Sequence, residues 1–452
     1  MNSNISRERA LLIGVAKSSK ERWTKIDSLE ELAALTLTAG GEVVEKIIQI
    51  RPKPNPAFFL GEGKIQEIKE LCREHKIELL IFDDPLTPSQ IRNIENATGV
   101  RTIDRTTLIL DIFAQHAKTA ESKIQVELAQ LDYRSTMLTG FGVELSRLGG
   151  GIGTRGPGEK KLEVDRRRIR ERIAVLKRNL TRIDKERLVQ RKQRDTLFKI
   201  ALVGYTNAGK STLMNRLTNA SVKVASYLFS TLDPNTKIVS LRQNLRAFLT
   251  DTVGFIKNLP HQLVASFRAT LSEIKEADLL LHIVDASVEE IEPKITAVKE
   301  TLKAIGAIDK PAILVFNKVD RVFEPEIIER LNRTYPNSVF LSSLTGEGVE
   351  ELKQRVADFI EQRLVTKTFL IPEGRLDLIA KLYEAGAVLE RTEKDGKVKL
   401  RVKGYPAVLL RTKKIIEGKT RSVRRVKQGE PLNSPRSSNP KNREFEGQSP
   451  SN

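Results

Sequence analysis

The sequence predicts a multidomain α/β protein, and three patterns lead to this prediction. Apolar segments of strand length alternate with segments of helical periodicity over residues 11–115, and the same alternation returns over residues 198–364. A heptad pattern separates these two regions, and a strand, a helix and a hairpin follow the second one. At roughly 100–200 residues per domain, a chain of 452 residues allows two to four domains.

The expected domain boundaries follow the changes in pattern. They are 1–116 for an N-terminal α/β domain, 117–195 for an antiparallel helical hairpin, 196–364 for a second α/β domain with a mostly parallel sheet and helices on both faces, 365–428 for a small α+β domain, and 429–452 for a disordered tail. The tail is expected to be disordered because it has four prolines among many serines and asparagines.

Strands and helices alternate in the N-terminal domain. Apolar runs predict strands at 11–16, 43–50 and 78–84, and helical spacing predicts helices at 29–39, 65–75 and 88–95. Gly40 and Gly41 end the first helix, and Pro88 suits the first turn of the third. The short GEGK segment at 61–64 lacks the spacing of a phosphate-binding loop, so it is interpreted as a strand-to-helix turn.

The hairpin is predicted from apolar residues at heptad spacing on both sides of a glycine-rich connection. The first helix carries Ala117, Ile124, Leu128 and Leu131, and the second carries Leu162, Ile169, Ile173, Leu176, Leu180 and Ile183. The connection is expected at 138–161 and contains Arg147, Arg155, Lys160 and Lys161. So many glycines are typical of a flexible linker, but the position of this segment at the end of a basic hairpin favours a probe-like tip.

The net charge of the chain is +19, and it is concentrated in two segments. Residues 155–194 hold 16 basic and 6 acidic residues, and residues 399–428 hold 11 basic residues and one acidic residue, so each segment has a net charge of +10. This regional excess favours an anionic partner, either nucleic acid or a membrane surface, over a generally solvated surface. Phosphate contacts of this kind confer affinity and salt sensitivity rather than sequence recognition.

Composition excludes several kinds of site. One cysteine rules out an intramolecular disulfide and a cysteine-based zinc site, and four scattered histidines argue against a histidine-rich metal site. No apolar run approaches the roughly 20 residues of a membrane-spanning helix, and the N-terminus lacks a signal-peptide core. A cytoplasmic location is expected, with peripheral membrane contact as the alternative.

The small C-terminal domain is predicted from a short βαββ pattern. It has a strand at 368–372, a helix at 375–384 and two alternating strands at 387–402. Asp395-Gly396 between the last two strands is typical of a two-residue hairpin turn. The basic segment that follows shows no clear amphipathic helix with aromatic anchors, which argues against a membrane-surface role.

Residues 198–217 carry a phosphate-binding loop. An apolar strand leads to Gly204-xxxx-Gly209-Lys210-Ser211, and a helical segment follows. In such a loop the backbone N–H groups and the helix N-terminus bind phosphates, the lysine reaches the β- and γ-phosphates, and the serine binds Mg²⁺.

Two further strand ends carry nucleotide signals. Asp251-Thr252-Val253-Gly254 supplies an aspartate for Mg²⁺ and a glycine whose N–H senses a γ-phosphate. Asn317-Lys318-x-Asp320 supplies a carboxylate that can accept from guanine N1–H and N2–H, which adenine cannot offer. The expected nucleotide is therefore GTP, and Ser342-Ser343-Leu344 stands where many GTPases have Ser-Ala-Lys.

These motifs define the expected GTP-binding site. In this order they are typical of a translation-factor-class GTPase. The expected GTP-binding residues are Gly204, Tyr205, Thr206, Asn207, Ala208, Gly209, Lys210, Ser211, Thr212, Asp251, Thr252, Val253, Gly254, Asn317, Lys318, Asp320, Ser342, Ser343 and Leu344.

The catalytic and metal-binding residues follow from the same motifs. Thr231 is the expected switch threonine, ahead of Thr236 and Ser230. The expected catalytic residues are Lys210, Thr231 and Gly254. Ser211, Thr231 and Asp251 are the expected Mg²⁺ ligands. Phe255 stands where many GTPases have a water-orienting glutamine, so intrinsic hydrolysis should be slow until a partner completes the site.

The sequence resembles the HflX family of ribosome-associated GTPases. The resemblance lies in GGGIGTRGPGEKKLEVDRR at 149–167, GYTNAGKSTL, LFSTLDPNT, DTVGFI and NKVD, and it covers nearly the whole chain. It implies binding to the large ribosomal subunit and GTP-dependent splitting of stalled or idle ribosomes, especially in stress. It also implies insertion of the hairpin loop near the peptidyl-transferase centre. The contacts implied here are Arg147, Gly149, Gly150, Gly151, Gly153, Arg155, Gly156, Lys160 and Lys161.

Some alternatives remain open at this stage. The runner-up is a GTP-switched RNA-binding module that remodels RNA without splitting subunits, and a third reading is a membrane-surface GTPase. In some related GTPases with the same loop, the residue equivalent to Asn207 helps to hold K⁺ against the phosphates, so K⁺ is a candidate cofactor beside Mg²⁺. The expected oligomeric state is a monomer.

Overall fold

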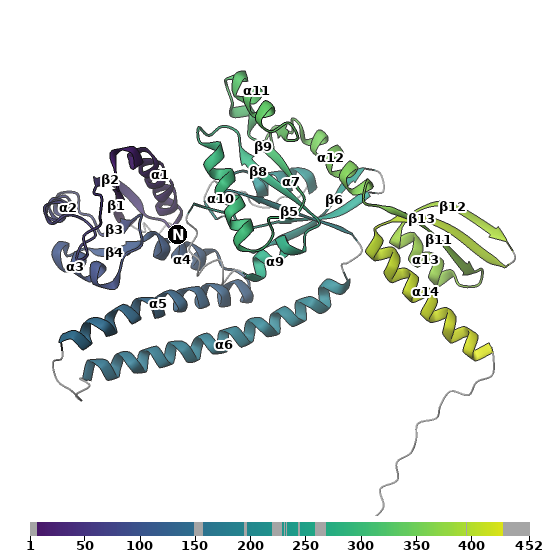
Figure 1. Cartoon of the computed structure of the whole chain (residues 1–452), viewed down its shortest axis with the longest axis horizontal. Helices are drawn as coiled ribbons and strands as arrows, with labels where there is room; N and C mark the ends of the chain where they lie inside the picture. Colours follow the sequence, from purple (N-terminus) through teal and green to yellow (C-terminus); the bar gives the residue numbers. More distant parts are fainter. Residues whose placement is uncertain are drawn as a thin grey trace, which may run out of the picture. The chain divides into compact units, whose positions relative to one another are not determined.

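The computed structural model (Figure 1) describes residues 7–148, 157–193, 197–218, 228–229, 231, 233–242, 245–257, 268–394 and 396–427. The chain divides into two compact units, Met1–Gln362 and Arg363–Asn452. The predicted multidomain α/β class is confirmed, whereas the expected boundaries inside the first unit stay predictions. The expected tail at 429–452 lies outside the described residues.

The N-terminal region is a four-stranded parallel sheet with helices on both faces. The sheet order is β2-β1-β3-β4. The strands are β1 (Arg9–Ala16), β2 (Glu42–Ile50), β3 (Leu79–Phe82) and β4 (Arg101–Asp104), and the helices are α1 (Arg22–Thr38), α2 (Glu62–Glu74), α3 (Pro88–Thr98) and α4 (Arg105–His116). Leu12 of β1 packs with residues of α1 and α4, while Leu11 and Ile13 pack with residues of α2 and α3. Alternate side chains of one strand therefore build two cores.

Two features of this region differ from the prediction. Helix α1 begins at Arg22, seven residues before the expected start, and β4 and α4 were not predicted. Apolar and buried residues cover most of the circumference of α4, so its helical period is weak in the sequence. Its start has a local signal, because the Asp104 carboxylate accepts the Thr107 backbone N–H at 2.9 Å.

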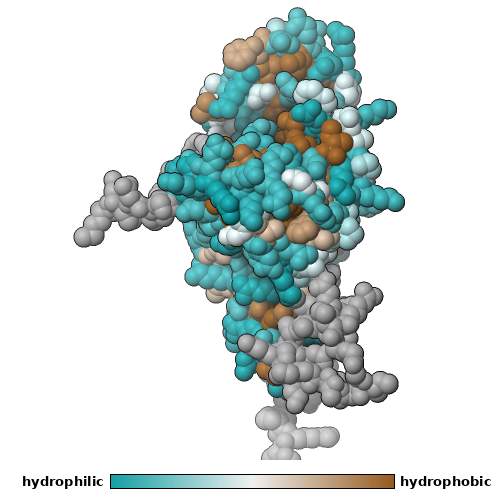
Figure 2. Space-filling model, turned by 90° about the vertical axis from the view of Figure 1, so that its left-hand side faces the viewer, coloured by the Kyte–Doolittle hydropathy of each residue, from teal (hydrophilic) through white to brown (hydrophobic). Residues whose placement is uncertain are grey.

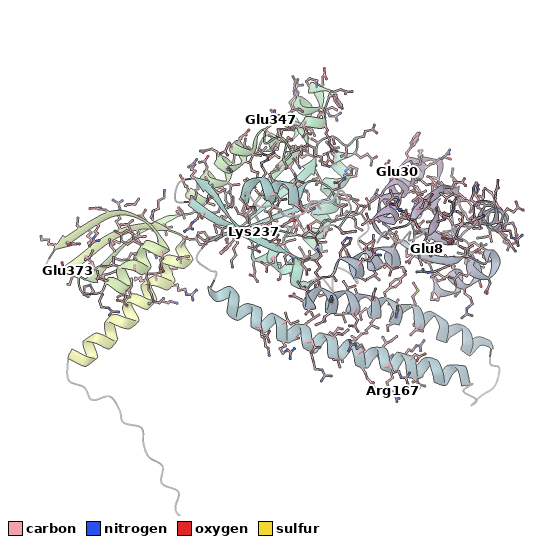
Figure 3. All side chains as sticks on the ribbon, turned by 180° about the vertical axis from the view of Figure 1, so that it is seen from behind. Glu8, Glu30, Arg167, Lys237, Glu347 and Glu373 are labelled. Atoms are coloured by element: carbon pink, nitrogen blue, oxygen red, sulfur yellow. The ribbon has the colours of Figure 1, made fainter. Side chains whose placement is uncertain are left out.

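Two long helices, α5 (Ala120–Leu148) and α6 (Pro157–Gln193), form an antiparallel pair (Figure 1). Arg172 of α6 donates to Glu127 at 2.6 Å, and Arg166 donates to the Leu138 carbonyl at 2.6 Å. Arg167 projects from α6 and its side chain is exposed (Figure 3). The prediction of a loop over 138–161 is wrong, because the two helices leave only 149–156 between them. A glycine inside a helix costs only about 1 kcal/mol, so Gly140 and Gly142 do not end α5.

The second α/β region contains a six-stranded sheet in the order β10-β9-β8-β5-β7-β6, in which only the β6–β7 pair is antiparallel. The strands are β5 (Phe198–Gly204), β6 (Asn235–Arg242), β7 (Leu245–Asp251), β8 (Leu279–Asp285), β9 (Ala312–Asn317) and β10 (Val339–Leu341). The helices are α7 (Lys210–Thr218), α9 (Arg268–Glu276), α10 (Ile291–Ala304), α11 (Pro325–Thr334) and α12 (Val349–Glu361). The functional motifs lie at the carboxyl ends of β5, β7 and β9, which meet at one edge of the sheet.

The second unit has a three-stranded antiparallel sheet in the order β11-β13-β12. Its elements are β11 (Val365–Pro372), α13 (Leu376–Ala385), β12 (Gly386–Lys394), β13 (Lys397–Gly404) and α14 (Pro406–Lys427). The predicted strand, helix and hairpin are present. Helix α14 was not predicted, and it packs Val408, Leu409 and Ile416 against the sheet. The basic segment is thus part strand and part helix. The expectation of no clear amphipathic helix with aromatic anchors is wrong as to the helix, whereas α14 carries no aromatic residue.

No helix in the described parts of the chain is long and apolar enough to cross a membrane. The face seen in Figure 2 is mostly hydrophilic and carries separate small hydrophobic patches.

Candidate nucleotide-binding site

The phosphate-binding loop connects the end of β5 to the start of α7. Gly204 ends the strand with a φ of +156°, and a Cβ atom there would collide with the carbonyl oxygen of Ile283 on the neighbouring strand β8. Only glycine therefore fits this close approach of two backbones. The helix begins directly at Lys210, so its first free N–H groups face the loop.

Lys210 is held inside the loop that its motif defines. Its Nζ atom donates to the Gly204 carbonyl at 3.1 Å and to the Tyr205 carbonyl at 2.8 Å, and the side chain is buried. Burial lowers the pKa of Lys210 to about 8, and the carboxylate of Asp251 opposes this shift only in part. The ammonium group is thus positioned beside the loop, where phosphate oxygens would be strong partners for it.

The three predicted Mg²⁺ ligands lie together. Ser211 Oγ lies 2.6 Å from Asp251 Oδ2 and 3.0 Å from Thr231 Oγ1, and Thr231 Oγ1 lies 3.2 Å from the same carboxylate oxygen. Asp251 Oδ1 is buried without a hydrogen-bond partner among the described residues. Two hydroxyls and a carboxylate form the hard oxygen donor set that suits Mg²⁺. Thr236, the second candidate, instead contacts Thr250 at 3.0 Å. The choice of Thr231 stays a prediction.

Gly254 and Phe255 have different structural roles. A Cβ atom on Gly254 would lie 2.8 Å from Thr206 Cγ2 and 3.1 Å from Lys210 Nζ, so the site requires glycine there. Phe255 is 1% exposed and belongs to the core, and its backbone N–H donates to the Gly204 carbonyl at 3.1 Å. The ring is therefore a packing group that cannot orient water.

Asn317 joins the two halves of the site. Its amide nitrogen donates to the Ala208 carbonyl at 2.8 Å, and its amide oxygen accepts the Ser343 backbone N–H and hydroxyl at 2.9 Å each. The serine that replaces the usual alanine thus finds a partner for its hydroxyl. Lys318 has a left-handed backbone with φ +66° and pairs with Asp285 at 2.7 Å.

The predicted base-recognition residues remain accessible. Asp320 and Leu344 are exposed at the rim, so the Asp320 carboxylate is available to a guanine. Ser342 is buried, and its hydroxyl accepts the Thr345 backbone N–H at 3.1 Å, which shapes the loop that carries Leu344.

The other expected binding residues lie in the same loops and, for Thr212, in the first turn of α7. Thr252 is fully buried and its hydroxyl donates to the Leu202 carbonyl at 2.6 Å, so it supports the strand end instead of facing a ligand. Asn207 is exposed with a left-handed φ of +59°. The remaining members of the set are Tyr205, Thr206, Ala208, Gly209, Thr212 and Val253.

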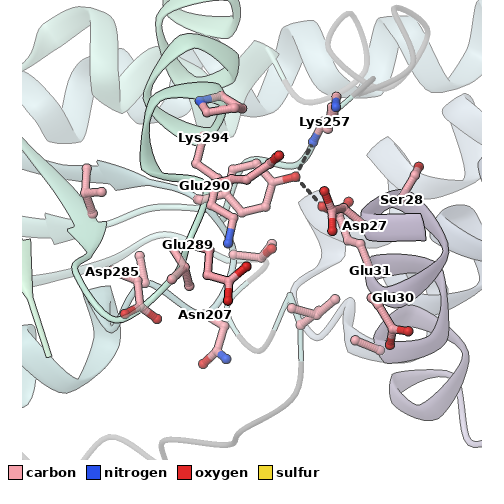
Figure 4. Close-up of a pocket in the computed structure, with 18 of the residues that line it drawn as sticks. Asp27, Ser28, Glu30, Glu31, Asn207, Lys257, Asp285, Glu289, Glu290 and Lys294 are labelled. Carbon is pink, nitrogen blue, oxygen red and sulfur yellow. Dashed lines mark hydrogen bonds between the residues drawn. The ribbon is translucent and has the colours of Figure 1, made fainter. Parts of the chain in front are cut away.

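Sequence reasoning missed a link between the phosphate-binding loop and the N-terminal region. The Tyr205 hydroxyl donates to Glu31 of α1 and accepts the Lys257 backbone N–H at 2.8 Å (Figure 4). Glu31 also pairs with the buried Arg105, which donates to Asp83 at 2.7 Å. Burial and the Glu31 carboxylate raise the pKa of Tyr205, so its hydroxyl remains a donor. No local pattern could have revealed a contact between residues 174 positions apart.

A cavity of about 570 Å³ lies beside this link and is lined by α1, the phosphate-binding loop and the start of α10. Figure 4 shows acidic side chains on both walls, among them Asp27 and Glu30 on one side and Glu289 and Glu290 on the other. Asp285, the partner of Lys318, lines the same cavity. Asp285 ends the buried strand β8, as Asp251 ends β7, so the sequence pattern could have marked both residues.

Removing the Tyr205 hydroxyl is expected to destabilise the first unit. Tyr205→Phe leaves the Lys257 N–H and the Glu31 carboxylate without this partner, so the free energy of unfolding should fall by about 1–3 kcal/mol. Urea unfolding followed by circular dichroism measures the change. Tyr335→Phe is the matched control, because its hydroxyl makes no hydrogen bond within the described residues. Equal midpoints for the two variants would contradict the role given to Tyr205.

The expected ribosome-contacting residues fall largely outside the described residues. Gly149, Gly150, Gly151, Gly153, Arg155 and Gly156 are not described, while Arg147, Lys160 and Lys161 lie in the facing ends of α5 and α6. Their role stays a prediction.

Comparison with known proteins places this site in a family. Family models match residues 26–114 (GTP-binding GTPase N-terminal), 116–194 (GTP-binding GTPase Middle Region), 199–318 (50S ribosome-binding GTPase) and 326–407 (HflX C-terminal domain). A GTP-binding protein of the archaeon Sulfolobus solfataricus, solved with GDP, is 26% identical with a TM-score of 0.42 and covers 78% of this chain and 99% of its own.

Two curated relatives are similar over most of their length. GTPase HflX of Lacrimispora saccharolytica is 45% identical over 394 residues, which are 86% of this chain and 92% of the relative. GTPase HflX of Escherichia coli is 44% identical over 385 residues, which are 84% of this chain and 90% of the relative. Together with the phosphate-binding loop and the Asn317 network, these matches show that the chain belongs to the HflX family of GTPases.

Proposed function

We propose that this GTPase binds the large ribosomal subunit and its RNA in the cytoplasm and dissociates stalled or idle ribosomes, especially in stress. The observation that carries the proposal is the buried Phe255, whose ring cannot orient water at the position where many GTPases have a glutamine. An enzyme of this kind hydrolyses GTP slowly alone and is stimulated when a partner completes the site. The match of residues 199–318 to a model described as a 50S ribosome-binding GTPase supports the ribosome as that partner.

The residues of the site have defined tasks in this proposal. Lys210 and the loop N–H groups bind and orient the β- and γ-phosphates, and Gly254 keeps space beside Lys210 for the γ-phosphate. Ser211, Thr231 and Asp251 would hold Mg²⁺, which neutralises phosphate charge when it is bound. Thr231 contacts both other ligands, so its segment can respond to the γ-phosphate.

The basic hairpin is the proposed ribosome-binding arm. Residues 155–194 have a net charge of +10, and α6 presents exposed arginines such as Arg167. Long-range attraction to ribosomal RNA would follow from this charge and weaken with salt. Residues 149–156 connect α5 to α6 in the sequence and are the proposed ribosome-contacting segment.

Sedimentation with purified ribosomes tests the proposal. With GTP, the protein should convert whole ribosomes into subunits, and with a non-hydrolysable analogue it should remain on the large subunit. Deletion of residues 149–158 should abolish subunit separation while GTP affinity remains within about twofold, because none of the expected GTP-binding residues lies in this segment. RNA binding without subunit separation by the intact chain would favour the GTP-switched RNA-binding module instead.

We also propose that K⁺ increases the rate of GTP hydrolysis through Asn207. This side chain is exposed at the loop and lines the cavity there, so it can reach an ion held against the phosphates. Hydrolysis should be faster in K⁺ than in Na⁺ at equal ionic strength. Asn207→Gly is the matched control, because glycine tolerates the left-handed backbone and removes only the side chain. Equal rates of the intact protein in both salts would exclude the idea.

A further inference from the structure

The sheet of the second unit has one covered face and one open face. Along β13, Val398, Leu400 and Val402 are buried against α13 and α14. The alternating residues Lys397, Lys399, Arg401 and Lys403 point the other way, as the period of a strand requires. On β12, Arg391 lies opposite the buried Leu400, and Tyr383 of α13 contacts it. This contact agrees with the position of α13 on the apolar face.

The neighbouring strands extend this open face. Opposite the four cations, β11 places Thr366, Thr368, Leu370 and Pro372, and β12 places Ala387, Glu390, Thr392 and Lys394. We call these twelve residues the open sheet face. It carries five cations and one carboxylate. The single carboxylate, Glu390, lies 3.9 Å from Arg401, and both side chains are about half exposed, so the pair neutralises little.

This charge pattern lowers the stability of the sheet, and the need for a hydrophilic surface does not account for it. Like charges directly opposite each other on neighbouring strands destabilise a sheet, and Lys394 lies opposite Lys397 in this way. Lysines on an edge strand protect a sheet from pairing with another chain, but β13 is the central strand, so this explanation does not apply. Lys397, Lys399 and Lys403 have no ion-pair partner among the described residues. A mixture of Lys and Glu would solvate the face equally well.

We propose that the open sheet face binds the phosphate backbone of RNA. Alternate residues of a strand lie about 6.7 Å apart, so the four cations form a line of roughly 20 Å. Such a line suits a linear polyanion better than one phosphate group. The threonines beside it supply hydroxyl donors of the kind that bind phosphate oxygens.

The composition of the face also limits the mode of binding. None of the twelve residues is aromatic, so bases have no stacking platform and binding should be independent of sequence. The lack of aromatic anchors likewise argues against a lipid surface. The choice of RNA over another linear polyanion rests on the proposed function.

The test uses the full chain and a short fluorescein-labelled single-stranded RNA of mixed sequence. The variant Lys397→Gln, Lys399→Gln, Lys403→Gln removes three cations from the open sheet face. The control Lys367→Gln, Lys413→Gln, Lys414→Gln removes the same charge elsewhere in this unit. Lys367 lies opposite Val402, on the covered face of the sheet, and the other two lysines are on α14. Fluorescence anisotropy over about 50–200 mM salt gives the slope of log K against log salt.

Each phosphate contact contributes about 0.7 to this slope for a single strand, so the face variant should lose about 2 from its magnitude while the control loses less than 1. Replacing the three lysines by Arg should restore the intact slope, which excludes misfolding as the cause. Equal slopes for the face variant and the control would overturn the proposal. A strong preference of the intact protein for one RNA sequence would also overturn it. So would a face variant that lost binding to anionic vesicles but bound RNA as the intact protein does.

The ribosome experiment separates this proposal from the proposed function. If the intact protein failed to split ribosomes but the face variant lost its RNA slope, the sheet proposal would stand and the proposed function would fail. If the intact protein split ribosomes and the face variant kept its slope, the proposed function would stand and the sheet proposal would fail.

Discussion

Replacing Asp320 by Asn should change the preferred nucleotide from GTP to xanthosine triphosphate. The Asp320 carboxylate is exposed at the rim of the site and can accept from both guanine N1–H and N2–H. An Asn amide offers one acceptor and one donor, which match N1–H and the 2-carbonyl of xanthine. A site with an unmatched polar group rejects a ligand by on the order of 10⁴-fold, so kcat/KM for GTP should fall by about that factor.

Steady-state hydrolysis of the two nucleotides by the variant measures this change. Because Asp320 is exposed, the substitution should leave the fold and the thermal unfolding temperature unchanged. Asp309→Asn, at another exposed aspartate of the same region, is the matched control and should retain the preference for GTP. If Asp320→Asn hydrolysed GTP at the original rate, base recognition would have to lie elsewhere.

Removal of the Lys210 ammonium should reduce GTP hydrolysis by on the order of 10²–10³-fold, because it deletes a charge positioned for the γ-phosphate before the reaction begins. Lys210→Met keeps much of the side-chain volume, so the buried loop should remain packed. Single-turnover hydrolysis at saturating GTP separates this loss from weaker binding.

The pKa of Lys210 adds a pH signature to the same residue. Its pKa in the protein without nucleotide is about 8, and phosphates would stabilise the charged form and raise it. Below pH 8 the ammonium is already charged, so GTP affinity should be flat. Above pH 8 binding takes up a proton, so affinity should fall by up to about tenfold per pH unit.

Calorimetric titration between about pH 7 and pH 9 would show this dependence, and Lys210→Met should abolish it. Lys275→Met, on α9, is the control and should bind GTP with the intact pH profile. An intact protein with flat affinity up to pH 9 would show that Lys210 is charged before nucleotide binds.

The nucleotide site was predictable because its signals are local. A strand, a glycine loop and a helix start fix the position of Lys210 and Ser211 within a few residues. Parallel strands then bring Asp251 and Asn317 to the same sheet edge, so motifs far apart in sequence meet in space. The choice of Thr231 depended on its position between motifs and stays a prediction, and the structure places its hydroxyl 3.0 Å from Ser211 Oγ.

The elements that were missed lacked a local signal or carried a misleading one. Helix α4 is apolar around most of its surface, which hides its period, and the glycines at the ends of α5 and α6 indicated a loop where the structure has helix. The Tyr205–Glu31 link depends on how two distant segments pack. Sequence periodicity describes one element at a time and contains no information on such packing.

Asn317 has a consequence for how this protein can evolve. One amide fixes both the Ala208 carbonyl of the phosphate-binding loop and the Ser343 position of the base-binding loop. A mutation there cannot alter base preference alone, because the same change releases the phosphate-binding loop. Selection therefore acts on the two loops together, while Asp320, which lies at the exposed rim, is free to vary with the nucleotide. New base specificity in this fold should arise at position 320 far more readily than at position 317.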